Sequence, residues 1–197
     1  MCIADRDYDD CCSLGHHNAC LTHTDGNSIE LYALNPVVFR KFVLVALGGF
    51  SITAEHLISQ CIAVLEQIYA IRSANELLKW GMSWIPFRRH ISIAGSSITF
   101  EAPGFVRAYL QKNGRTQDKD IFSEAVEKVF QGLDADPMKR MRGHDLSELL
   151  FLIVSKIRKE KRFGNSDTLE GCLMATVEKN DLEPHALFKS IRAFSGS

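Results

Sequence analysis

The chain has 197 residues, of which 46% are hydrophobic and 24% are charged, and its formal net charge at pH 7 is −1. This length and composition predict one compact domain with a substantial buried core. The near-zero net charge excludes a protein that coats nucleic acid through bulk positive charge, so any polyanion binding must depend on local cationic clusters.

The apolar segments argue against a membrane protein. The longest charge-free apolar stretch, Phe42 to Ala54, is shorter than the roughly 20 residues that a transmembrane helix needs. No charged region followed by an apolar one opens the chain, so we expect no secretory signal. In that setting the six cysteines are expected to stay reduced.

Residues 1–32 differ in composition from the rest and are predicted to form an irregular arm. They hold four of the six cysteines and three of the seven histidines, and they show no apolar periodicity. Because thiolate and imidazole groups are good zinc ligands, this arm could supply a tetrahedral set. The adjacent cysteines match no standard zinc finger, and an unstructured arm without metal is the alternative interpretation. The candidate ligands are Cys11, Cys12, His16, Cys20 and His23.

The next segments are predicted to be helical. From about Pro36 the chain becomes apolar as far as Gly48-Gly49, which we interpret as a helix terminator. Thr53 is a plausible N-cap for two amphipathic stretches that run together and end at Pro86. This interpretation puts Trp80 and Trp84 on one helical face. Apolar and polar residues then alternate around Gly95-Ser96, which predicts a small β hairpin over 91–100.

The second half of the chain is also predicted to be helical. Short helices are expected over 104–112 and 121–130. Asp145 and Glu148 have the spacing of a capping box, and the helix that they open is apolar on nearly every side over 149–154. The sequence therefore predicts a mainly α domain over 33–170, followed by a tail over 171–197 with one short helix near 183–194.

The order and spacing of these elements resemble the coat proteins of rod-shaped plant viruses of the tobamovirus type. The resemblance covers roughly residues 40–170. No single motif in it is very specific, and two departures are Asn75, where the family uses an arginine, and Leu169, where it has phenylalanine. The matching segments are Leu57, Ile58 and Cys61 of the first bundle helix, Trp84-x-Pro86 after the second, the Arg-x-Arg at 140–142, the last long helix at 152–158, and Leu169-Glu170.

This resemblance implies a fold and a function. The family fold is an up-and-down four-helix bundle with a small β hairpin at one end, polymerised helically around single-stranded genomic RNA. The chain would then be a structural capsid subunit, with itself and RNA as partners and the virion and host cytoplasm as its locations. It would need no cofactor and catalyse no reaction. Carboxylates meeting between subunits could control disassembly, with Asp118, Asp120 and Glu124 as candidates.

Two basic clusters are candidate RNA contacts. Arg140 and Arg142, with Lys139, precede a predicted helix N-terminus, where free N–H groups and a partial positive charge favour phosphate. The alternative is a solvated basic turn. The second cluster lies at the other end of that helix, where basic residues more often complement the helix dipole. Its residues are Lys156, Arg158 and Arg162.

Motifs for calcium binding and for catalysis are incomplete or absent in this sequence. Residues 134–145 have the spacing of an EF-hand loop, but Lys139 replaces its glycine and Asp145 its bidentate glutamate, so calcium binding is not expected. No P-loop, Gly-x-Ser-x-Gly or His-Glu-x-x-His motif is present, so an enzyme is not expected. The alternative to a coat subunit is a helical RNA-binding or regulatory protein, such as a viral silencing suppressor or a signalling adaptor, with an N-terminal zinc-binding arm.

Overall fold

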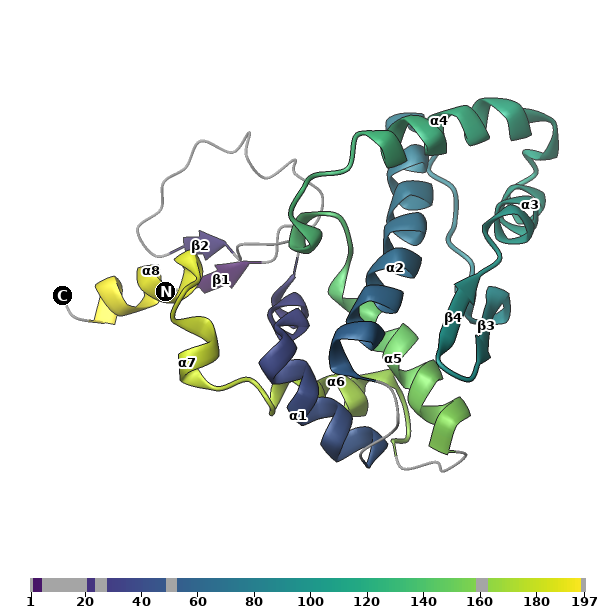
Figure 1. Ribbon diagram of the computed structural model, residues 1–197. Helices are drawn as coiled ribbons and strands as arrows, with labels where there is room; N and C mark the ends of the chain where they lie inside the picture. Colours follow the sequence, from purple (N-terminus) through teal and green to yellow (C-terminus); the bar gives the residue numbers. More distant parts are fainter. Residues whose placement is uncertain (1, 5–20, 24–27, 49–52, 159–162, 196–197) are drawn as a thin grey trace.

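The computed structural model describes residues 2–4, 21–23, 28–48, 53–158 and 163–195. Over these ranges the fold is mainly helical with a small antiparallel hairpin, as predicted (Figure 1). Most of the predicted zinc ligands and part of the second basic cluster lie outside the described residues. These are Cys11, Cys12, His16, Cys20 and Arg162.

The N-terminal region supplies two short strands and two helices. β1 (Cys2–Ala4) pairs in parallel with β2 (Leu21–His23), so these two segments of the predicted arm are extended and paired. The 3-10 helix η2 (Ile29–Leu34) leads into α1 (Pro36–Leu47). Asn35 caps α1 by accepting a hydrogen bond from the Val37 N–H, and Gly48 ends it at φ 65°. The predicted terminator at Gly48 is confirmed.

α2 (Ala54–Leu77) is the long central helix, and Thr53 caps it as predicted by accepting a hydrogen bond from the His56 N–H. The two stretches matched to the first and second helices of the coat-protein bundle are therefore one continuous helix. The prediction that the helix reaches Pro86 is wrong. Lys79 (φ 52°) and Gly81 (φ 60°) turn the chain away after Leu77.

The segment after α2 folds back against it, which explains the early end of the helix. The Asn75 side chain accepts a hydrogen bond from the Met82 N–H at 3.0 Å, which fixes the returning chain. Trp80 and Trp84 consequently lie on this non-helical segment, and the prediction that they share a helical face is wrong. Trp84 packs instead against Phe105 and Tyr109.

The hairpin and two helices follow. The 3-10 helix η3 (Phe87–His90) precedes β3 (Ile91–Ala94), which pairs antiparallel with β4 (Ser97–Phe100) around Gly95 (φ 59°), as predicted. α3 (Ala102–Lys112), the 3-10 helix η4 (Thr116–Asp118) and α4 (Lys119–Gln131) come next. α4 packs across the C-terminal part of α2 (Figure 1).

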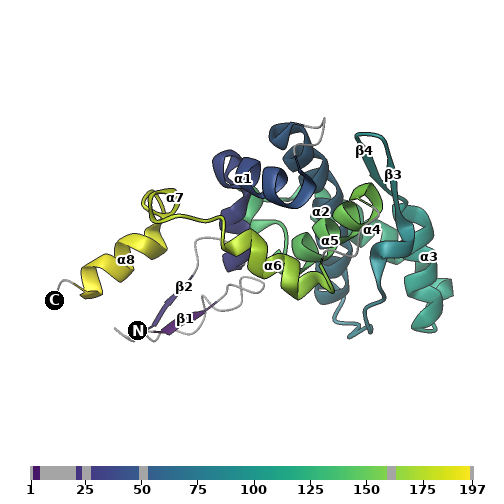
Figure 2. The same cartoon turned by 90° about the horizontal axis from the view of Figure 1, so that it is seen from below.

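The last part of the chain completes the core on the other side of α2. It comprises η5 (Pro137–Lys139), α5 (Gly143–Arg158), α6 (Ser166–Met174), α7 (Lys179–Leu182) and α8 (Ala186–Ser195). α6 was not predicted, whereas α8 confirms the helix near 183–194. Figure 2 shows α1, α2, α5 and α6 gathered in the middle, with α7 and α8 to one side. This arrangement does not confirm an up-and-down four-helix bundle.

A buried ion pair joins α2 to α5. The Nε and Nη2 atoms of Arg72 donate hydrogen bonds to the two carboxylate oxygens of Asp145 at 3.0 and 2.8 Å, and the side chains are 15% and 7% exposed. The Arg72 guanidinium also stacks 3.6 Å from the centre of the Trp84 ring. The predicted capping role of Asp145 is therefore wrong, because α5 begins at Gly143 and this carboxylate binds Arg72.

Replacing Asp145 by asparagine tests this ion pair. We expect Asp145→Asn to lower the free energy of unfolding by about 3–5 kcal/mol, since it removes the hydrogen-bonded counter-charge of the mostly buried Arg72 guanidinium. The double variant Arg72→Met with Asp145→Leu removes both charges, and its free energy of unfolding should fall by much less. Urea denaturation of the three proteins measures the difference. A double variant as unstable as the single one would contradict this account.

Candidate functional site

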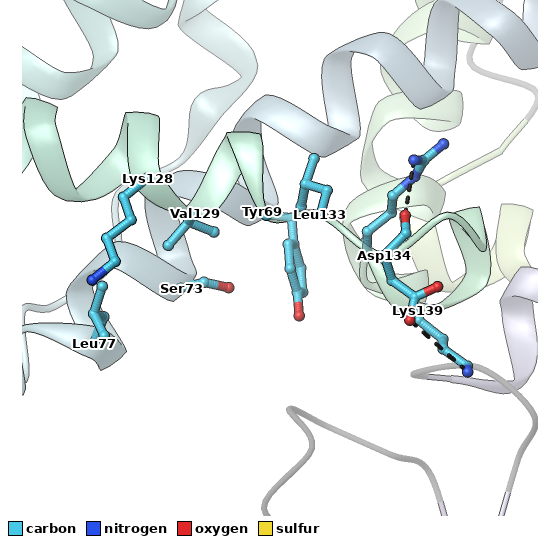
Figure 3. Close-up of a pocket in the computed structure, with 10 residues that line it drawn as sticks. Tyr69, Ser73, Leu77, Lys128, Val129, Leu133, Asp134 and Lys139 are labelled. Atoms are coloured by element: carbon cyan, nitrogen blue, oxygen red, sulfur yellow. Dashed lines mark hydrogen bonds and ion pairs between the residues drawn. The ribbon is translucent and has the colours of Figure 1, made fainter.

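The predicted basic turn borders a hollow of about 410 Å³ between α2 and α4 (Figure 3). Tertiary packing forms this hollow, because α4 crosses α2 and the loop after α4 returns along the same face. Two of the three predicted RNA contacts of this turn, Lys139 and Arg140, line the hollow. The polar residues around it are Tyr69 and Ser73 of α2, Lys128 of α4, and Asp134, Lys139 and Arg140 of the following loop.

Arg140 is held by contacts within the protein. Its Nε lies 2.8 Å from Glu66 Oε1 on α2, and its Nη1 donates a hydrogen bond to the Asp134 carbonyl at 2.9 Å. The Arg140 and Glu66 side chains are only 23% and 16% exposed. Arg140 therefore anchors the turn to α2, and Glu66 already balances most of its charge.

Arg142 does not share this site with Arg140. Met141 between them is fully buried, and Arg142 is half-buried with its Nε atom covered. Arg142 is not among the residues that line the hollow. The structure therefore separates the two arginines that the sequence placed together.

Lys128 and Lys139 are the more accessible cations. Lys128 is exposed, and the Lys139 side chain is 42% exposed, with its Nζ 4.0 Å from Asp134 Oδ2. Figure 3 shows them on opposite sides of the hollow, with the Tyr69 ring between them. With Arg140, and against Asp134 and Glu66, the site carries an excess of one positive charge.

The floor of the hollow contains a hydroxyl group. The Ser73 Oγ atom is covered and has no hydrogen-bond partner among the described residues. Tyr69 and Ser73 are four residues apart and so share one face of α2. Neither Ser73 nor Lys128 is part of a sequence motif, so sequence reasoning did not identify them. Only the crossing of α4 over α2 brings them together.

The second basic cluster is described only in part. Lys156 is exposed near the end of α5, and its Nζ donates a hydrogen bond to the Ile91 carbonyl of β3 at 3.2 Å. Lys156 therefore ties α5 to the hairpin. Arg158 is the last residue of α5, and its side chain, like all of Arg162, lies outside the described structure.

The aspartates of the EF-hand-like segment have local roles. Asp134 Oδ1 accepts a hydrogen bond from the Asp136 N–H, and Asp136 Oδ1 accepts one from the Met138 N–H. Asp145 binds Arg72. These carboxylates shape the turn and position α5. Of the predicted disassembly carboxylates, Asp118 pairs with Arg115 at 3.1 Å, and Asp120 and Glu124 are exposed.

Two further groups of residues have side chains of the types that take part in catalysis or metal binding. Cys61 of α2 is fully buried, and burial raises the pKa of its thiol to about 12, so it is not a nucleophile. The neighbouring His56 lies with its Nε2 3.2 Å from the Ser96 carbonyl. Among the described residues, one cluster of three side chains has the composition of a metal site: Glu30, His144 and Glu170.

Comparisons of this chain with protein-family models, curated proteins and solved structures found no match. None of the helices in the described part of the chain combines the length and the apolar character that a membrane crossing requires.

The packed state of Cys61 can be tested by alkylation. We expect iodoacetamide at mildly alkaline pH to leave Cys61 unmodified in the folded protein and to modify it in urea, because a buried thiol with a raised pKa forms little thiolate. Peptide mass spectrometry measures the modification. Cys172, a half-buried thiol on α6, is the internal control and should react more readily. Equal labelling of both thiols before unfolding would contradict the buried position of Cys61.

Proposed function

We propose that this protein is a structural subunit that binds single-stranded RNA and assembles with copies of itself, as its resemblance to rod-shaped virus coat proteins implies. The observation that supports it best is the hollow in which Lys128 and Lys139 flank Tyr69. In this proposal the helical core of the subunit consists of α1, α2, α4 and α5, with α2 in contact with the other three.

The hollow has the chemistry of a site for single-stranded RNA. Ammonium groups on both sides can contact successive phosphates, and such contacts carry no sequence preference, as packaging of a whole genome requires. A tyrosine ring between the cations offers a surface on which a base can stack. Arg140 contributes indirectly, because its contact with Glu66 fixes the loop that carries Lys139.

Apolar residues exposed at two distant places support self-assembly. On α1, Leu44 is 66% exposed and Val37 is 52% exposed; on α4, Ile121 is 56% exposed and Phe130 is 42% exposed. α1 and α4 lie at opposite ends of the molecule in Figure 1. Two different surfaces that meet between copies form a head-to-tail contact, which generates a ring or an open helical polymer.

The second candidate is a helical RNA-binding or regulatory protein that does not polymerise. Two observations favour it: the ion pair that engages Arg140, and the continuity of α2 where the coat-protein family has two bundle helices. Negative-stain electron microscopy, with and without added RNA, separates the candidates. Discs or rods support the coat subunit, whereas uniformly small particles that still bind RNA support the second candidate.

The double variant Lys128→Ala with Lys139→Ala tests the RNA site. We expect weaker binding to single-stranded RNA and a salt dependence of log K against log salt that is shallower by about 1.4, since each phosphate contact to a single strand contributes about 0.7. Fluorescence anisotropy at several salt concentrations measures both quantities.

The matched control for this variant is Lys112→Ala with Lys189→Ala, which removes two exposed lysines from α3 and α8. It should keep the original slope. An identical slope for all three proteins would rule out the hollow as the phosphate site. Arg140→Ala is a poor probe, because it leaves Glu66 without its partner and so perturbs the fold as well.

The variant Leu44→Glu tests the assembly surface. Because Leu44 is largely exposed, a charge there should leave the unfolding midpoint nearly unchanged while it prevents contact between copies. We expect loss of large particles in sedimentation and microscopy. The control Gln111→Glu adds the same charge at an exposed position on α3 and should still assemble. Normal particles from Leu44→Glu would exclude α1 as an assembly surface.

A further inference from the structure

Glu30 is a buried acidic residue whose charge the fold does not fully satisfy. It lies in η2 and is 3% exposed, and its Oε2 atom has no hydrogen-bond partner among the described residues. The carboxylate faces the first residue of α5, where a Cβ atom at Gly143 would lie 2.3 Å from Oε2. The Ser28 Oγ accepts a hydrogen bond from the Gly143 N–H at 2.7 Å, so that donor is already used.

Two other chelating side chains converge on this carboxylate. The Nδ1 atom of His144, the second residue of α5, lies 3.4 Å from Glu30 Oε1 and 3.4 Å from Glu170 Oε2 on α6. One ligand atom from each of the three residues lies within 4.8 Å of the others. The cluster therefore joins η2, α5 and α6, elements that also pack against one another.

These spacings suit a small tetrahedral cation. Zinc binds imidazole nitrogen and carboxylate oxygen at about 2.0–2.2 Å, which places neighbouring ligand atoms about 3.4 Å apart. Both separations at His144 Nδ1 have this value. The contact of His144 Nδ1 with Glu170 Oε2 at 3.4 Å is a long hydrogen bond. A strong one between a charged nitrogen and a carboxylate oxygen would bring the two atoms to about 2.7–2.9 Å.

We infer that Glu30, His144 and Glu170 form a site for a divalent transition-metal ion of the zinc class, with a fourth position open to water. Three protein ligands with one open position are typical of zinc sites that exchange ligands. The His144 side chain is 72% exposed, so the ion has a route of entry. This inference does not depend on RNA binding or on assembly.

The local charges are compatible with such an ion. Two carboxylates offset the two charges of the cation, and Arg142 nearby opposes it, since the same arginine lowers the pKa of His144. Without metal, the His144 Nδ1 atom lies between the Glu30 and Glu170 carboxylates, 3.4 Å from the nearest oxygen of each.

Binding should stabilise the fold, because ligands from three elements come together only in the native state. We expect zinc added to chelator-treated full-length protein to raise the melting temperature. His144→Ala and Glu170→Gln should each abolish that rise and weaken zinc affinity by roughly 100-fold or more, since even the loss of a residue that only supports a ligand costs 10–100-fold. His56→Ala, which removes an exposed histidine from α2, is the matched control and should keep the full rise.

Cobalt substitution distinguishes this site from the cysteines of the N-terminal region. A cluster of nitrogen and oxygen ligands gives visible cobalt absorption without a thiolate charge-transfer band, whereas cysteine ligands produce that band. Absorption without the band, lost in His144→Ala, supports the inference. A thiolate band alone, an unchanged melting temperature with zinc, or equal zinc affinity in wild type and both variants would overturn it. Both variants change partly exposed side chains, so they should fold.

Discussion

The contact of Arg72 with Asp145 is the interaction on which the arrangement of this fold depends. Two charges in a mostly buried position are stable only when their geometry satisfies nearly all of their hydrogen-bonding capacity. The bidentate contact gives both carboxylate oxygens of Asp145 a charged donor, and the Arg72 guanidinium also stacks on Trp84. Because the three residues belong to α2, α5 and the segment between α2 and η3, one cluster sets the relative position of all three.

The same contact explains why the phosphate site that we propose differs from the one that the sequence predicted. The start of α5 was expected to attract phosphate through its partial positive charge, but the protein places its own carboxylates there. Asp145 lies in the first turn, and Glu30 faces Gly143. An anionic ligand has little to gain at a helix terminus that is already neutralised. The accessible cations lie instead across the hollow beside α4, on Lys128 and Lys139.

The sequence predicted local structure better than it predicted the site. Periodicity and turn residues located the Thr53 cap, the Gly48 terminator, the hairpin around Gly95, and the helices over 102–112 and 119–131. These features depend on a few neighbouring residues. The end of α2 was missed because it depends on the contact of Asn75 with Met82, which forms only when the chain folds back.

The roles of charged residues could not be predicted for a related reason. Arg140 and Arg142 are adjacent to the same residue in sequence, yet Arg140 pairs with Glu66, which is distant in the chain, and lines the hollow, whereas Arg142 does not line it. Likewise, Glu30 and Glu170 meet His144 only because η2 and α6 pack on the start of α5. No spacing rule connects positions so far apart. The charge pattern of the sequence therefore indicated where cationic side chains occur, but not which of them the fold leaves exposed to solvent.

Gly143 shows how closely η2 packs against the start of α5. A single methyl group there would overlap the Ser28 Oγ atom and the Glu30 carboxylate, so even alanine would require both buried side chains to shift. The hydrogen bond that the Gly143 N–H donates to Ser28 Oγ would then be disturbed as well. Because residue 143 has no side chain, η2 can pack closely against the start of α5, beside α6.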